Sequence, residues 1–273
     1  MFIPSLLLAK GYVCGELQGQ LGNQMFIVAA TYSLAKENNA IPVFPDFLTK
    51  NMYNLSKNFE EFFFRCNVIN PKIKFQKIYV EPFFHYKKIP YTKNMILRGY
   101  FQSEKYFSNY KGDIIKLFAP SEKIKTYIQD KYSRLLENEN TVAIHIRNYL
   151  KEDPNGLYHP NCTLAYYCNA LKQVPENAKL VVFTNDLRYA KELLQNRSGI
   201  FEFIENESYI VDFYLMSMCK NTIISNSSFS WWAAYLNSNK EKIVVAPKRW
   251  FNSNYIKDVD DIFPDDWIVL DGN

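Results

Sequence analysis

Residues 212–236 read DFYLMSMCKNTIISNSSFSWWAAYL. A short β-branched run, 222–224, lies inside this stretch, and helix-like segments flank it at 208–219 and 230–237. The same alternation extends outward, with strands expected at 141–146, 180–183, 200–204 and 242–245, and helices at 164–173 and 187–195. Short apolar strands that alternate with helices predict a parallel sheet covered on both faces. The second half of the chain is therefore expected to be a doubly wound α/β domain, whose ligands bind beyond the carboxyl ends of the strands.

The first half of the chain opens in a similar way. A strand is expected at 12–17, and the turn GQLGNQ leads from it into a helix at 25–38 and a strand at 41–44. Residues 51–110 are irregular and aromatic, with one strand expected at 95–100, and a long polar helix is expected at 121–138. Two α/β domains with a cleft between them follow, 1–138 and 139–273. Taken alone, GQLGNQ allows two interpretations: a phosphate-binding loop, or a tight turn that starts a helix.

The composition indicates a globular protein and excludes a strongly basic one. Hydrophobic residues make up 48% of the 273 residues, and the net charge is +4 from 32 basic and 28 acidic residues. This charge is too small to indicate nucleic-acid binding, although it suits a small anionic ligand. Aromatic residues reach 16%. They could line a sugar-binding cleft, or they could reflect a general compositional bias.

The cysteines and the N-terminus bear on location. The five cysteines show no CxxC spacing, which favours reduced thiols in a reducing compartment. The apolar segment FIPSLLLA at residues 2–9 is too short to span a bilayer. We therefore expect a cytoplasmic protein without a transmembrane segment, and association with the periphery of a membrane is left open.

The segment AIHIRNYLKED, residues 143–153, places two candidate residues at the end of a strand. Alternation along the strand puts His145 and Arg147 on one face, with Arg147 at the carboxyl edge of the sheet. A guanidinium there matches a diphosphate bidentately and stays charged. The alternative is a structural arginine that pairs with Glu152 or Asp153.

A second candidate segment is VVFTNDLRYAK, residues 181–191, in which a strand runs through Thr-Asn-Asp into a helix. Asn185 or Asp186 could hold a ribose or a base at the end of the strand. An ordinary helix N-cap is the alternative for either residue.

The third candidate lies within the opening stretch, where a strand ends at Asn226 and a helix starts near Phe229. Serine hydroxyls and free backbone N–H groups at a helix start form an anion site that needs no metal. Plain capping by the serines is the alternative. Trp231 and Trp232 are expected in the core.

Metal sites are poorly supported by the sequence. The three histidines show no ligand spacing with the cysteines. The segment 258–261, Asp-Val-Asp-Asp, is similar to the DxD that binds a divalent ion in one class of glycosyltransferase, but a solvated turn is the favoured interpretation. We therefore predict no metal site and no cofactor.

Together these segments resemble the α-1,2-fucosyltransferases of glycosyltransferase family 11. The resemblance runs in family order along nearly the whole chain. It rests on LQGQLGNQMF (17–26), HIR (145–147), HPNCTLAYYCNAL (159–171), VVFTND (181–186), the long block 212–236 and VVAPKRWF (244–251).

The resemblance implies a GT-B-like fold: two Rossmann-like domains that face a central cleft, with parallel sheets covered by helices. Residues 1–138 would form the acceptor-side domain, and residues 139–273 the domain that binds GDP-fucose. The implied reaction is transfer of L-fucose from GDP-β-L-fucose to a galactose hydroxyl of a glycan, with inversion and without a metal. GDP-fucose and a glycan acceptor are the implied partners.

The resemblance also implies roles for individual residues. Arg147 would neutralise the β-phosphate, and His145 and Asp212 would lie around the guanosine. Asn23 would approach the transferred sugar from the first domain. The segment Ser228 to Ser230, with Phe229 between them, would lie against the diphosphate. We add Gly22, Asn185, Asp186 and Ser227 to the predicted donor site.

One departure from the family pattern concerns catalysis. The family has Arg-Arg-Gly-Asp-Tyr after His-Ile, whereas this chain has Arg147-Asn148-Tyr149. The nearest carboxylates that could act as a general base are Glu152 and Asp153, and both could equally be surface charges. Another nucleotide sugar, another acceptor linkage, or a homologue that binds without full catalysis remain as alternatives.

Overall fold

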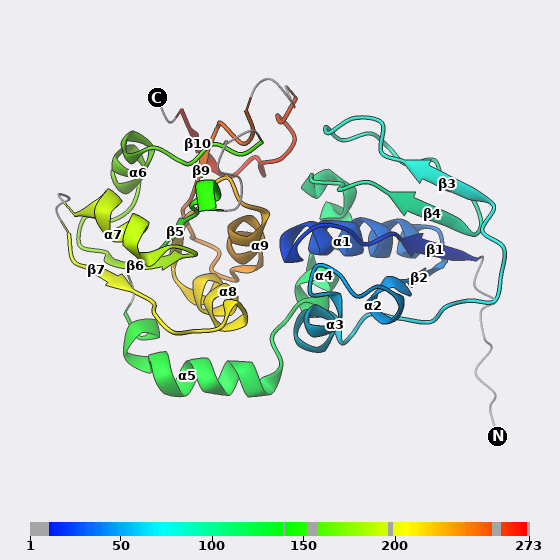
Figure 1. Ribbon diagram of the computed structural model, residues 1–273, viewed down its shortest axis with the longest axis horizontal. Helices are drawn as coiled ribbons and strands as arrows, with labels where there is room; N and C mark the ends of the chain where they lie inside the picture. The colour runs from blue at the N-terminus through cyan, green and yellow to red at the C-terminus, as the bar shows by residue number, and fades with distance from the viewer. Residues whose placement is uncertain (1–10, 139, 152–157, 196–198, 253–257, 272–273) are drawn as a thin grey trace. The chain divides into compact units, whose positions relative to one another are not determined.

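The computed structural model describes residues 11–138, 140–151, 158–195, 199–252 and 258–271 (Figure 1). The chain forms two compact units. Unit 1 comprises residues 1–119 and 260–262, and unit 2 comprises residues 120–259 and 263–273.

Unit 1 is built on a parallel sheet of four strands in the order β2-β1-β4-β3. The strands are β1 Tyr12–Gly15, β2 Ile41–Val43, β3 Lys77–Val80 and β4 Met95–Arg98. Helix α1, Leu21–Glu37, follows β1 and is buried along most of its length. It therefore forms the centre of the unit's core, and its first turn lies at the carboxyl edge of the sheet.

Short helices and aromatic side chains complete unit 1. The Phe63 ring packs 4.9 Å from Phe47 and edge-on at 5.6 Å from Phe118, which accounts for part of the aromatic richness of this region. The helical segments are α2 Asp46–Thr49, α3 Leu55–Asn58, a π-helical turn Phe59–Phe63, two 3₁₀ turns Glu104–Tyr106 and Ser108–Tyr110, and α4 Lys111–Leu117.

Residues 260–262 return to unit 1. The Asp261 carboxylate accepts a hydrogen bond from the Tyr86 backbone N–H at 2.8 Å and forms an ion pair with Lys105. Asp261, in the segment that is similar to DxD, is thus engaged with protein groups.

Unit 2 contains a parallel sheet of six strands in the order β10-β9-β8-β5-β6-β7. Strands β6 and β7 lie on one side of β5, and β8, β9 and β10 lie on the other. The strand order therefore reverses between β5 and β8, which makes this pair the topological switch point of the sheet. The strands are β5 Thr141–Ile146, β6 Lys179–Thr184, β7 Phe201–Phe203, β8 Asn221–Ile223, β9 Val244–Pro247 and β10 Ile268–Leu270.

Helices cover both faces of this sheet, as its apolar strands require. One face, which includes Val142 and Ile144 of β5, packs against α6 and α7. On the other face, the His145 ring lies 5.8 Å from Phe229 of α9, and Phe229 packs against Phe213 of α8. The helices of unit 2 are α5 Glu122–Leu136, α6 Leu164–Leu171, α7 Leu187–Leu194, α8 Tyr209–Met218 and α9 Ser228–Leu236, with a 3₁₀ turn at Tyr149–Lys151.

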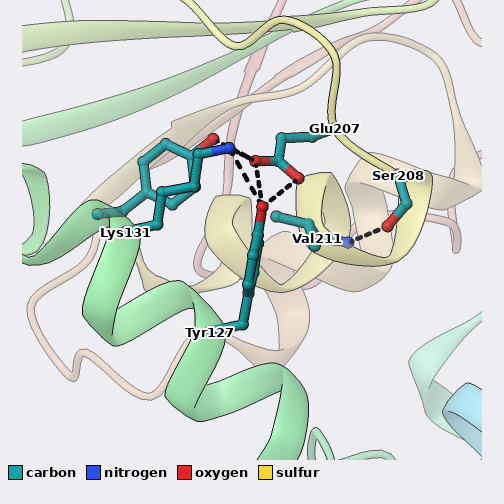
Figure 2. A network of polar contacts seen from close by, with 6 residues as sticks. Tyr127, Lys131, Glu207, Ser208 and Val211 are labelled. Atoms are coloured by element: carbon teal, nitrogen blue, oxygen red, sulfur yellow. Dashed lines mark hydrogen bonds and ion pairs between the residues drawn. The ribbon is translucent and has the colours of Figure 1, made fainter.

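The parallel α/β architecture predicted from the sequence is confirmed. The division between the units differs from the predicted boundary at 138, because α5 belongs to unit 2. Glu207, which precedes Ser208, the N-cap of α8, accepts hydrogen bonds from Tyr127 at 3.0 Å and Tyr132 at 2.8 Å and pairs with Lys131 at 2.5 Å (Figure 2). These three contacts fasten α5 to unit 2, so the division falls between 119 and 120.

Candidate functional site

Arg147 is the first residue after β5, at the carboxyl edge of the sheet of unit 2. Its guanidinium carbon lies 5.5 Å from the centre of the Tyr149 ring. The Tyr149 hydroxyl donates a 2.7 Å hydrogen bond to the Asn226 carbonyl oxygen, in the loop that follows β8. Tyr149 therefore joins the ends of the two strands at the switch point, and Arg147 lies beside this link.

The start of α9 lies on the other side of the switch point. Ser227 precedes the helix with an extended backbone and makes no side-chain capping bond with the described residues. The Ser230 hydroxyl is fully buried and donates to the Ser227 carbonyl oxygen at 3.2 Å. Because the first N–H groups of a helix have no acceptor within it, the start of α9 can donate to an anion.

The sheet register brings these two features together. Strands β5 and β8 are parallel neighbours, with Ile144 opposite Ile223. Arg147 and Ser227 follow these two residues at similar distances along the chain, so they lie at the same edge. A cationic side chain beside a helix start is suited to a diphosphate.

His145, in β5, lies in the interior of unit 2. Its Nδ1 lies 2.8 Å from the Ser225 hydroxyl, and its side chain is buried. Burial, and secondarily the charge of Arg147, lower the pKa of His145 to about 3. His145 is therefore a neutral ring that links β5 to the residues after β8, and its contact with guanosine stays a prediction.

Asn185 and Asp186 hold the loop that follows β5. The Asn185 side chain accepts from the Asn148 N–H at 2.8 Å and donates to the Asn148 carbonyl at 3.0 Å. Asp186 caps α7 by accepting from the Tyr189 N–H at 3.1 Å, and it also accepts from the Asn148 side chain at 3.1 Å. The hydrogen bond from the Tyr189 N–H contributes most to lowering the pKa of Asp186. Asp186 is therefore the N-cap of α7, which was the alternative to a role in holding a ribose or a base.

The same loop uses residues that were not predicted from the sequence. The Asn161 side chain accepts from the Tyr149 N–H at 2.8 Å and donates to Asn148 at 3.0 Å. Asn226, 1% exposed, donates to the carbonyls of Pro160 and Trp250. The sequence feature that could have identified these two residues is their amide side chain, in the segments HPNCT (159–163) and SNSS (225–228). Glu152 and Asp153, the predicted base candidates, lie outside the described residues.

Asp212 lies in the first turn of α8. Burial, with a smaller contribution from Glu207, raises its pKa from 3.8 to about 7. Its Oδ1 is buried and has no hydrogen-bond partner among the described residues. A buried carboxylate oxygen without a hydrogen-bond donor is unusual in a folded protein.

In unit 1, Gly22 and Asn23 lie in the first turn of α1, which begins at Leu21 rather than at the predicted residue 25. Asn23 Oδ1 accepts a 2.7 Å hydrogen bond from Gln102 in the loop after β4. Gly19 has φ +71°, and a Cβ there would lie 2.4 Å from Asn23 Nδ2. Gly19 therefore permits both the tight turn and the position of Asn23.

Replacing Gly19 by alanine is expected to lower the free energy of unfolding by about 1–2 kcal/mol, the cost of a left-handed conformation in a residue with a Cβ. Urea denaturation measures this change. Gly112 in α4 is the matched control, because a Cβ there meets no atom within 4 Å. Gly112→Ala should be neutral or stabilising by up to about 1 kcal/mol. Equal effects of the two substitutions would contradict this role of Gly19.

Other features of the described residues concern metals, thiols and membranes. No group of three or more His, Cys, Asp or Glu side chains is placed there to hold a metal ion. None of the five cysteines, all of which the structure covers, forms a disulfide. Within the same ranges, no helix combines the length and the apolar character needed to cross a bilayer.

Comparisons with known proteins place the chain in a family. The model of Glycosyl transferase family 11 matches residues 10–271. The Escherichia coli O-antigen biosynthesis glycosyltransferase WbnK is 31% identical over 193 residues, which are 67% of this chain but only 63% of that protein. An Escherichia coli alpha-1,2-colitosyltransferase is 29% identical over 290 residues, 95% of this chain and 99% of that protein.

A solved structure shares the fold. The Bradyrhizobium alpha-1,6-fucosyltransferase NodZ, soaked with GDP-fucose, superposes with a TM-score of 0.53 at 15% identity. The superposition covers 83% of this chain and 92% of NodZ. With the family match over residues 10–271, these findings show that the chain is a glycosyltransferase that belongs to glycosyl transferase family 11.

Proposed function

We propose that this enzyme transfers L-fucose from GDP-β-L-fucose to the 2-hydroxyl of a terminal galactose, with inversion and without a metal ion. The observation that carries the proposal is the convergence of Arg147 and the start of α9 at the switch point of unit 2. Nucleotides bind at this place in doubly wound sheets. The family match supports the reaction class.

In the proposed reaction, the acceptor oxygen forms a bond to the anomeric carbon of fucose from the face opposite the diphosphate. The bond between this carbon and the phosphate oxygen breaks, and GDP leaves with the electron pair. The Arg147 guanidinium and the N–H groups at the start of α9 would stabilise the charge that develops on the diphosphate. The acceptor proton passes to a base, for which Glu152 and Asp153 stay candidates.

Asp212 would recognise the guanine ring. An ionised carboxylate accepts from the ring N–H and the exocyclic amino group of guanine, and neither uracil nor cytosine offers this pair of donors. The unpartnered, buried Oδ1 of Asp212 is the observation that supports this role. Because Asp212 has a raised pKa, its ionised fraction changes near neutral pH.

We therefore expect GDP affinity to rise about tenfold between pH 6 and pH 8, because only the ionised form of a group with a pKa of about 7 is competent to bind. Calorimetric titration at several pH values measures the slope. Asp212→Asn is the control: it retains the titration of the GDP phosphate but should remove the contribution of the carboxylate. Identical slopes in the two proteins would argue against the guanine contact.

The raised pKa of Asp212 also makes the stability of the folded protein depend on pH. The folded protein holds the Asp212 proton more tightly than the unfolded chain, whose pKa is near 3.8. The stabilising contribution of this group is therefore complete below pH 3.8 and is lost as the pH rises through 7.

The reaction is tested by mass spectrometry with lactose as the acceptor, GDP-fucose as the donor and EDTA present throughout. We expect one fucose to be added in an α-1,2 linkage, and EDTA to leave the rate unchanged. GDP-colitose is the second donor to test, because the colitosyltransferase aligns with 95% of this chain. Transfer of colitose without transfer of fucose would identify GDP-colitose, and not GDP-fucose, as the donor. Binding of GDP without transfer of either sugar would favour a binding protein.

A further inference from the structure

Strand β3 forms an outer edge of the sheet of unit 1, because β4 is its one partner among the described strands (Figure 1). The pairing continues past both ends of β3. The Gln76 N–H donates to the Asn94 carbonyl at 2.8 Å, and the Glu81 N–H donates to the Arg98 carbonyl at 2.8 Å. Residues 76–81 therefore form one continuous edge of the unit.

Two apolar side chains of this edge lie on the face of the sheet that is turned away from α1. Gly15 marks the α1 face, because a Cβ there would lie 3.2 Å from Ile27 of that helix. The register through β4 places Tyr79 on the same face as Gly15. Because side chains alternate along a strand, Ile78 and Val80 lie on the opposite face, where they are 47% and 56% exposed.

An exposed aromatic side chain follows the strand. Phe83 lies three residues after Val80 and is 51% exposed. Its ring stacks on the His85 ring with the two centres 5.0 Å apart, and the Lys87 Nζ lies 5.2 Å from the centre of the Phe83 ring. A half-exposed apolar ring is thus held beside a cation at the carboxyl end of β3.

The segment that contains β3 concentrates the positive charge of the chain. Six of the 32 basic residues but one of the 28 acidic residues lie in residues 72–93, so the rest, with 26 basic and 27 acidic residues, has a net charge of −1. The acidic residue is Glu81, whose carboxylate already accepts from the N–H groups of Tyr100 at 2.7 Å and Phe101 at 3.0 Å. None of the six basic residues, all exposed lysines, forms an ion pair with a described residue. They are Lys72, Lys74, Lys77, Lys87, Lys88 and Lys93.

The lysines border the apolar side chains at both ends of the strand. Lys77 is the first residue of β3. Lys93 lies at the same end, because the next residue, Asn94, is hydrogen-bonded to Gln76. Lys87 lies at the other end, against the aromatic ring that follows the strand. The edge therefore presents apolar side chains between two groups of cations.

Two ordinary explanations do not account for this surface. A lysine in an edge strand discourages pairing with another chain, but only Lys77 of the six lies in β3. Single exposed apolar residues are common on soluble proteins. Here, however, Ile78 and Val80 share one face of the same strand, and Phe83 follows them closely.

We infer that residues 72–93 form a surface that docks unit 1 on a lipid bilayer with anionic headgroups. The lysines would meet the lipid phosphates, and Ile78, Val80 and Phe83 would enter the boundary between headgroups and acyl chains. A second copy of the chain would bring the same lysines to the interface and would be repelled. Nucleic acid would complement the lysines but offers no apolar layer to the two aliphatic side chains. An anionic bilayer complements both features.

Co-sedimentation of the full-length protein with phosphatidylcholine vesicles, with and without about one third phosphatidylglycerol, tests this inference. We expect binding to the anionic vesicles that is at least about tenfold weaker without phosphatidylglycerol and that falls as salt is added. Lys74→Ala and Lys87→Ala should each weaken binding about fivefold, the effect of one lysine near an anionic surface. Phe83→Ser, and separately Ile78→Ser combined with Val80→Ser, should weaken it about tenfold through lost apolar burial.

Matched controls come from unit 2. Lys125→Ala removes an exposed lysine of α5, and Ile200→Ser removes an apolar side chain that is 91% exposed. Both controls should sediment with the vesicles as the wild type does. Transfer of sugar to soluble lactose should be unchanged in every variant. The docking does not rest on the proposed function, because sedimentation decides it even if the wild-type protein transfers no sugar.

Four results would overturn the inference. The first is a wild-type protein that does not sediment with anionic vesicles. The second is lysine variants that sediment as Lys125→Ala does, and the third is serine variants of residues 78, 80 and 83 that sediment as Ile200→Ser does. The fourth, measured by gel filtration with light scattering, is an assembly that these serine variants dissociate, because the edge would then bind a second copy. If the double variant does not fold, as thermal unfolding shows, Phe83→Ser decides the apolar contribution.

Discussion

Arg147→Ala is expected to lower kcat about 10³-fold, the upper range for removing one preorganised donor to a developing oxyanion. Arg147 is a positively charged side chain at the switch point, where the diphosphate of the donor would lie. Its loss would leave the helix start to stabilise the leaving group alone. Steady-state transfer assays measure the effect, and thermal unfolding shows whether the fold is retained.

Two further variants test whether the loss of rate is specific to the Arg147 guanidinium. Arg147→Lys keeps the charge but not the planar fork, so it should recover only part of the lost rate. Arg188→Ala is the matched control, because its side chain is 88% exposed and pairs only with Glu192 on the same helix, as far as the described residues show. A kcat of Arg147→Ala above one tenth of the wild-type value would remove Arg147 from the proposed mechanism.

Trp231→Ala is expected to lower the free energy of unfolding of unit 2 by about 3–5 kcal/mol, the usual cost of truncating a fully buried tryptophan. Trp231 has no exposed surface, and its ring packs 4.8 Å from Tyr235 and 5.4 Å from Trp267. It lies in α9, so a cavity there would also loosen the helix whose start forms the anion site.

Tryptophan fluorescence in urea is a selective measurement, because all four tryptophans of the chain lie in unit 2. Ile200→Ala is the control, since Ile200 is 91% exposed, and its effect should stay within about 0.5 kcal/mol. A loss below about 1 kcal/mol in Trp231→Ala would mean that α9 is not held by this cluster.

Much of unit 2 could be predicted from the sequence, because its strands are continuous apolar runs. Strand β5 has the predicted bounds, and Asp186 makes the N-cap bond that was the alternative to a ligand role, accepting from Tyr189 N–H. Helix α8 starts at Tyr209, next to the predicted start at 208. Strand β3 was not predicted, because it lies at the edge of its sheet and is largely exposed, so it lacks an apolar pattern. Local pattern identifies buried elements better than exposed ones.

The candidate site was predictable where it depends on strand order and not where it depends on contacts between loops. Arg147 and Ser227 follow neighbouring strands, and a doubly wound sheet brings such positions together. The Tyr149–Asn226 bond joins residues 77 apart in sequence, and nothing local indicates it. The raised pKa of Asp212 likewise depends on burial and on Glu207, which α5 holds from far along the chain.

The central claim is that the switch point of unit 2 binds the diphosphate of GDP. Calorimetric titration of GDP into wild type, Arg147→Ala and Arg188→Ala, with EDTA present, tests it most directly. We predict one GDP per chain, an affinity reduced about 10–100-fold in Arg147→Ala, as for a lost charge-assisted bond, and no change in Arg188→Ala. Equal GDP affinity in all three proteins would contradict the claim.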